Sequence, residues 1–128
     1  MGVFRVDGEI INPRHPGQRV DVHGHLVDSG SESTWLPEDT LRRAGIAVRK
    51  KDVRFLMANS ETVSRQVGYA IVRASGFETV DEVVFGQPGD LSLLGARTLE
   101  GFGAVVDARR KRLIAAGPHV AALSARAA

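Results

Sequence analysis

The sequence contains no cysteine, which excludes disulfide bonds, thiolate catalysis and cysteine-ligated zinc. Long apolar segments are also missing, because the longest uninterrupted apolar run has four residues, whereas a membrane-spanning helix needs about 20. Residues 1–5 include no apolar core of a secretory signal. These absences predict a cytoplasmic protein that does not bind a membrane.

A large excess of charge of one sign is absent too, since 17 basic side chains stand against 15 acidic ones. The resulting formal charge of +2 is too small to indicate nucleic-acid binding by itself. Two basic runs, Arg49–Lys51 and Arg109–Arg112, could contact phosphates. Both lie where turns are expected and neither contains an aromatic residue, so solvated turns are the better interpretation. We therefore expect no nucleic-acid partner.

The length of the chain fits one domain. Its 128 residues, 43% hydrophobic and 25% charged, have the composition of a globular protein, and a chain of this size buries roughly two-thirds of its unfolded surface. No internal repeat and no Gly/Ser-rich linker divides it. We place the domain at residues 19–118, after a strand-and-turn extension over 1–18 and before an Ala-rich tail over 119–128.

Apolar residues recur mostly at every second position, which predicts a mainly β fold. In this pattern Val20, Val22, Gly24, Leu26 and Asp28 share one face of a strand. Gly and Pro residues separate the other expected strands. These are residues 3–11, 53–58, 62–73, 80–85, 104–107 and 112–115.

Two short helices complete the expected elements. Residues 37–45 begin with proline, carry acids in the first turn and arginines near the other end, and close on glycine. This is the pattern of a capped helix. A second helix is expected over 96–102, where Leu99 and Phe102 have helical spacing. The fold class is therefore mainly β with one or two short helices.

A carboxyl group ends one of the expected strands. Leu26-Val27 runs directly into Asp28-Ser29-Gly30, and an acid at the end of an apolar strand is costly unless something uses or compensates it. Asp-Ser-Gly is also ordinary turn chemistry, so the tripeptide alone favours a turn. Two later segments favour a functional role for this carboxyl group over a simple turn. They are the helix end at Gly45-Ile46, and Leu93-Leu94-Gly95, about 65 residues after Asp28.

In this order and spacing, these segments resemble the retropepsin-like aspartic proteases, in particular their single-domain bacterial and cellular members, over roughly residues 20–114. The resemblance implies a small closed β-barrel, a flap hairpin over a cleft and an active site shared by two chains. Asp28 would be the catalytic acid, and the supports of its loop would be Ser29, Gly30, Leu94 and Gly95. The substrate-binding residues would be Ser31, Glu32, Ala58, Asn59 and Ser60.

The flap implied by the resemblance falls on the hairpin around residues 59–61. Viral members have a Gly-rich flap tip, whereas residues 57–61 contain no glycine. At this tip Asn59 can adopt a positive φ, whereas Ser60 does so with more strain.

The chemistry of the family needs two carboxylates that share one proton, one activating water and the other polarising the peptide carbonyl. Because the chain has one Asp-Ser-Gly, a symmetric homodimer would place Asp28 beside its copy on the two-fold axis. The implied protein is an aspartic endopeptidase that acts on peptide or protein substrates without a metal or organic cofactor. The alternative is a non-catalytic dimeric module that binds an extended peptide on the same fold.

His23 and His25 are the remaining candidates for a metal site, because residues two apart lie on one strand face and this spacing occurs in zinc sites. Asp28 has the opposite parity on that strand, and no third nitrogen or sulfur ligand is nearby in the sequence. A solvated or partly packed strand face is therefore favoured, and no metal is expected.

Overall fold

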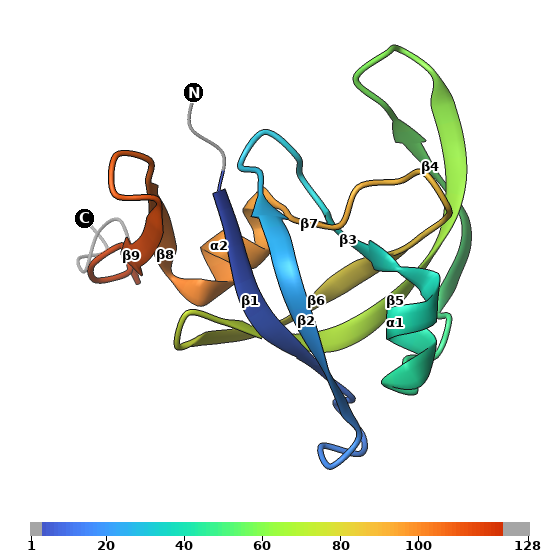
Figure 1. Cartoon of the computed structure of the whole chain (residues 1–128), viewed down its shortest axis with the longest axis horizontal. Helices are drawn as coiled ribbons and strands as arrows, with labels where there is room; N and C mark the ends of the chain where they lie inside the picture. Colours follow the sequence, from blue (N-terminus) through green and yellow to red (C-terminus); the bar gives the residue numbers. More distant parts are fainter. Residues whose placement is uncertain (1–3, 122–128) are drawn as a thin grey trace, which may run out of the picture.

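Nine strands and two helices form the described part of the chain, residues 4–121, in the computed structural model (Figure 1). The strands are β1 (Phe4–Ile11), β2 (Arg19–Val27), β3 (Thr34–Pro37), β4 (Lys50–Leu56), β5 (Thr62–Ala74), β6 (Phe77–Gly86), β7 (Leu93–Leu94), β8 (Ala104–Asp107) and β9 (Arg112–Ala115). The helices are α1 (Glu38–Arg43) and α2 (Ala96–Phe102). The predicted mainly β class with short helices is confirmed. Most of the tail expected over 119–128 lies outside the described residues.

Seven of the described strands form one sheet in the order β1-β2-β7-β3-β6-β5-β4. Because β1 also pairs with β5, six of them close into a ring. β1 is hydrogen bonded along both edges, to β2 and, through residues 8–11, to β5. Residues 4–11 are therefore an integral part of the closed sheet. The remaining pair, β8 and β9, forms a separate two-stranded sheet.

The strand periodicity places the main core inside the ring. On β5 the side chains of Ala70, Val72 and Ala74 are buried, whereas Tyr69 before them and Arg73 between them are exposed. The core also contains Leu36, Leu41, Phe85 and Leu94, all completely buried. Burying one such side chain stabilises the fold by roughly 1.5–3 kcal/mol, and the cluster includes residues from Phe4 on β1 to Leu113 on β9.

Both helices were predicted closely by local sequence signals. In α1, Pro37 occupies the N-cap, Glu38 and Asp39 lie in the first turn, and two arginines lie in the last turn. In α2, Gly103 ends the helix with a left-handed φ of 67°, a conformation that glycine adopts without strain. No helix of residues 4–121 is long and apolar enough to span a membrane.

The regular alternation predicted for β2 is interrupted at Gly24. This glycine has φ +72°, and the pairing of β1 with β2 shifts register opposite it. Consequently the buried positions change parity, from Val22 before the irregularity to His25 and Val27 after it. The predicted common face of His23 and His25 is wrong: His23 is exposed and His25 is completely buried.

Candidate active site

Asp28 lies at the carboxyl end of β2, in the loop that connects β2 to β3. These consecutive strands are not neighbours in the sheet, because β7 lies between them, parallel to β2 and antiparallel to β3. The Asp28 N–H donates to Leu94 O at 3.0 Å, so the ladder with β7 continues one residue past the strand. The loop lies at the same end of the molecule as the tip of the β4–β5 hairpin (Figure 1).

The loop orients the Asp28 carboxylate through its own backbone. Gly30 N–H donates to Asp28 Oδ1 at 3.0 Å, and Ser31 N–H donates to the Asp28 carbonyl at 3.1 Å. Asp28 is half-buried, whereas Ser29 and Gly30 are exposed. A turn closed by the Asp side chain therefore presents the carboxylate at the edge of the solvent in one orientation.

Gly95 and the start of α2 hold the loop from behind. The N–H groups of Ala96 and Arg97 donate to the carbonyls of Ser31 (2.7 Å) and Glu32 (3.1 Å). A Cβ on Gly95 would overlap the Ser33 carbonyl, so only glycine permits this close approach. Leu94 and Gly95 thus lie directly against the Asp28 loop.

A chain of buried hydroxyl groups links the same elements, and the sequence pattern did not reveal it. The Gly95 N–H donates to Thr34 Oγ1 at 2.9 Å, and Thr34 Oγ1 lies 2.6 Å from Thr98 Oγ1. Thr98 donates its single hydroxyl hydrogen to Asp81 Oδ2 at 2.9 Å, so Thr34 is the donor to Thr98. The chain joins β3, α2 with its N-cap Gly95, and β6 behind the Asp28 loop.

The β4–β5 hairpin has the form expected of a flap. Its tip is closed by Met57 N–H donating to Glu61 O at 2.8 Å and by Ser60 N–H donating to Met57 O at 2.9 Å. The positive φ, 70°, belongs to Ser60, which adopts it with more strain than asparagine does. Asn59 Oδ1 instead accepts a hydrogen bond from Glu61 N–H at 3.0 Å, which stabilises the tip.

An apolar cluster joins the flap to the strands beside Asp28. Its buried members are Trp35, Val67, Val84 and Leu93, against which Leu26, Val53, Phe55, Met57 and Val63 pack. The rings of Trp35 and Phe55 meet in an edge-to-face arrangement at a centroid distance of 5.1 Å. This cluster, which the sequence analysis did not single out, forms an apolar floor under the flap.

A hollow of about 300 Å³, which we name the flap hollow, opens between the loop and the flap. Its lining includes Glu32 and Ser33 from the loop, Val53 and Phe55 from β4, and Arg97 from α2. The structure thus brings Glu32 next to the flap strand. The other residues expected to bind substrate lie elsewhere: Ser31 turns its hydroxyl to Ser33 O, and the tip residues Ala58, Asn59 and Ser60 are exposed outside the lining.

A nearly buried ion pair fixes the flap to the segment before β7. Arg65 on β5 donates two hydrogen bonds to Asp90, at 2.8 and 3.0 Å, and its guanidinium lies over the Trp35 ring. The hydrogen bonds from Arg65 hold the pKa of the Asp90 carboxyl below its usual value. This geometry restrains the base of the flap, and only the tertiary structure revealed it.

The part of the chain that the structure describes contains no candidate metal centre. Within residues 4–121 no three His, Cys, Asp or Glu side chains lie close enough together to hold a metal ion. His23 and His25 lie on opposite sides of β2, and both ring nitrogens of His25 lack a hydrogen-bond partner within the described residues.

A closed β ring, a flap and an Asp-Ser-Gly loop held by a Leu-Leu-Gly segment are together the attributes of a retropepsin-like domain. Comparison with known families agrees, because a family model for aspartyl proteases matches residues 14–98, more than half of the chain. The protein therefore belongs to the aspartyl protease family, in its retropepsin-like form. A search of curated proteins finds no match.

Proposed function

We propose that the protein is an aspartic endopeptidase whose active site forms when two copies bring their Asp28 side chains together. The observation that carries the proposal is the Asp28 carboxylate, held by Gly30 N–H at 3.0 Å at the edge of a loop that is supported from behind by α2. This orientation depends on packing that only glycine allows, and a simple turn does not require such packing. We therefore infer that the carboxylate is oriented for catalysis.

The reaction follows from the pairing of two acids. Two adjacent carboxylates retain one proton between them, because like charges so close do not both ionise readily. The ionised Asp28 takes a proton from the attacking water, whose oxygen bonds to the peptide carbonyl carbon, while the protonated copy gives its proton to the carbonyl oxygen. When this intermediate collapses, the C–N bond breaks, the amine nitrogen leaves with the proton that Asp28 had taken, and the other carboxyl group takes back a proton from the intermediate's hydroxyl, which restores the singly protonated pair. Ser29, which is exposed, would bond the partner's loop through its hydroxyl, and Gly30, which has no side chain, would leave room for the substrate backbone.

We place an extended peptide between the loop and the flap. An extended chain presents its backbone N–H and C=O groups to both walls, and its side chains alternate between them. Ser31 and Glu32 would meet it from the loop, and Ala58, Asn59 and Ser60 from the flap tip. Leu56, which is 76% exposed beside that tip, adds an apolar contact.

Asp28→Asn is the variant that tests the proposal. The amide keeps the shape of the side chain and removes the acid, so hydrolysis of an unbiased peptide mixture should stop while circular dichroism and dimer mass stay unchanged. Asp21→Asn, at an exposed position on β2, is the matched control and should cleave normally. Equal cleavage by Asp28→Asn would refute the assignment. Peptide binding without hydrolysis by the unaltered protein would favour the non-catalytic module.

Assembly and pH provide two further readouts of the same test. Activity per chain should fall on dilution, because only the dimer contains a complete site. Catalysis needs the singly protonated pair, so the rate should be bell-shaped with an acidic maximum. Activity of a monomer that is independent of concentration, or a plateau at alkaline pH, would contradict a shared dyad.

A further inference from the structure

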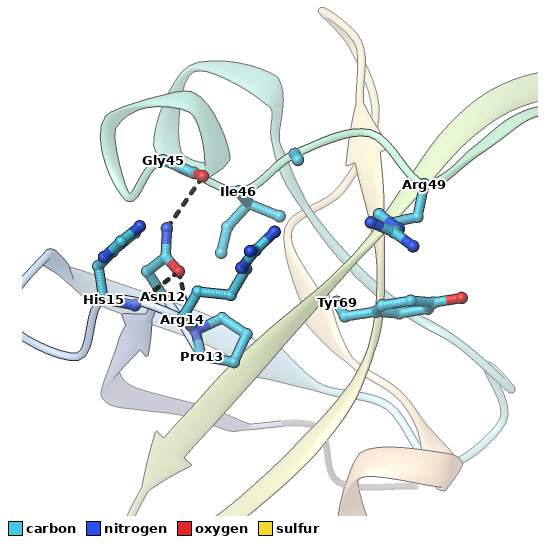
Figure 2. A pocket seen from close by; sticks show the side chains of 9 residues that line it. Asn12, Pro13, Arg14, His15, Gly45, Ile46, Arg49 and Tyr69 are labelled. Carbon is cyan, nitrogen blue, oxygen red and sulfur yellow. Dashed lines mark hydrogen bonds between the residues drawn. The ribbon is translucent and has the colours of Figure 1, made fainter.

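A second hollow, of about 260 Å³, shares none of its lining residues with the flap hollow. It opens where the turn after β1 (residues 12–15), the segment between α1 and β4 (residues 45–49) and Tyr69 on β5 meet (Figure 2). We name it the arginine hollow, because Arg14 and Arg49 are among the residues that line it (Figure 2).

The walls of the arginine hollow are fixed before any ligand arrives. Asn12, which is 6% exposed, donates from Nδ2 to the carbonyls of Ala44 and Gly45, at 3.2 and 3.0 Å. Its Oδ1 accepts from the backbone N–H groups of Arg14 and His15, at 2.9 and 3.1 Å. One buried amide side chain thus fastens the turn after β1 to the end of α1.

The opposite wall is equally constrained. Arg49 N–H donates to Val67 O at 2.8 Å. A Cβ on Gly68 would approach Ala47 O to 2.5 Å and the Ile46 side chain to 2.8 Å, so segment 45–49 lies close against β5 only because residue 68 is glycine. A preformed hollow binds a ligand with less entropy loss than a mobile one.

The charge of this hollow is one-sided. Arg14, His15 and Arg49 line it, and no Asp or Glu does. Among residues 4–121 none of these three side chains forms an ion pair. The Arg49 guanidinium instead lies over the Tyr69 ring, 5.8 Å from its centroid. By contrast, Arg42, Arg65 and Arg73 each bond a carboxylate.

We propose that the arginine hollow binds a multiply charged oxyanion, the phosphate or carboxylate groups of a small ligand. Guanidinium groups present paired N–H donors that match the oxygens of phosphate and carboxylate. Arg14 and Arg49 supply two such groups to the anion, His15 lies at the edge of the hollow, and no acid in the lining competes for them. Because Arg49 immediately precedes β4, the bound anion would contact the base of the flap.

Isothermal titration calorimetry with sodium pyrophosphate and sodium citrate, at constant ionic strength, tests the proposal on the full chain. We expect saturable binding of at least one probe at one site per chain. Arg14→Ala and Arg49→Ala should each weaken it about tenfold or more, because each removes charged hydrogen bonds. Arg109→Ala, in the exposed β8–β9 turn, removes the same charge elsewhere and should leave binding unchanged.

Comparison of the two probes identifies whether phosphate or carboxylate is the preferred source of the anion. Asp28→Asn should bind the probe like the unaltered protein, so the result does not depend on the proposed hydrolysis. Absence of saturable binding with both probes would overturn the proposal. Equal weakening by Arg109→Ala would overturn it as well, since attraction would then come from net charge alone.

Discussion

His25 should limit the stability of the fold in acid. Its side chain is completely buried, and neither ring nitrogen has a hydrogen-bond partner within the described residues. Burial lowers the pKa of His25 from 6.5 to about 4, although the nearby charge of Asp7 opposes the change. A proton on His25 would place an uncompensated charge inside the protein, so the folded state holds the ring neutral.

The magnitude follows from proton linkage. Between pH 6.5 and about 4 the unfolded chain binds a proton that the folded chain refuses, so the free energy of unfolding falls as the pH falls. The full difference is about 3 kcal/mol, and it stops growing below the folded pKa because both states are then protonated. This is a large part of the 5–15 kcal/mol, roughly, by which a domain is stable.

His25→Leu should remove this loss. Leucine is apolar, and the His25 ring has no hydrogen bond to lose within the described residues, so the variant should fold at neutral pH. We expect its unfolding free energy to decline between pH 6.5 and 4 by about 3 kcal/mol less than that of the unaltered protein. Urea unfolding at equal protein concentration, followed by the fluorescence of the single, buried Trp35, measures the difference.

His23→Gln is the matched control, because His23 is a neighbouring histidine with its side chain 81% exposed. It should keep the acid loss of the unaltered protein. If His25→Leu loses stability between pH 6.5 and 4 as steeply as the unaltered protein, the buried neutral histidine is not the cause and the reasoning is refuted.

Two substitutions test the support of the Asp28 loop by thermal or urea unfolding. Gly95→Ala should cost at least about 2 kcal/mol, because its Cβ would overlap Ser33 O; Gly17→Ala, where nothing lies within 4 Å, should change stability by less than about 0.5 kcal/mol. Thr98→Val should cost about 1–3 kcal/mol, because it leaves the buried Thr34 hydroxyl without an acceptor. Stability equal to that of the unaltered protein in either variant would contradict the corresponding contact.

Local signals in the sequence were sufficient for much of the fold. Pro37 and Gly45 marked the helix between them, and the second helix has the predicted bounds, because caps and helical spacing act over a few residues. The two-residue period of apolar residues predicted the strand over 62–73, which in the structure ends one residue later, at Ala74. Two contiguous motifs, Asp28-Ser29-Gly30 and Leu93-Leu94-Gly95, indicated the loop and the segment that supports it. Each can be recognised in the sequence because its residues are adjacent and its glycine is needed for steric reasons.

What the sequence by itself determined is therefore the class of fold, its helices and the loop that carries Asp28. Only the tertiary structure decided that β7 separates β2 from β3, that Gly24 turns His25 inward, and that Thr34 bonds Thr98. It also decided that Arg14 and Arg49 share a hollow. These contacts join residues tens of positions apart, or depend on one irregular residue, and no short pattern records them. Their positions follow from closure of the ring, which brings distant segments together when the core is buried.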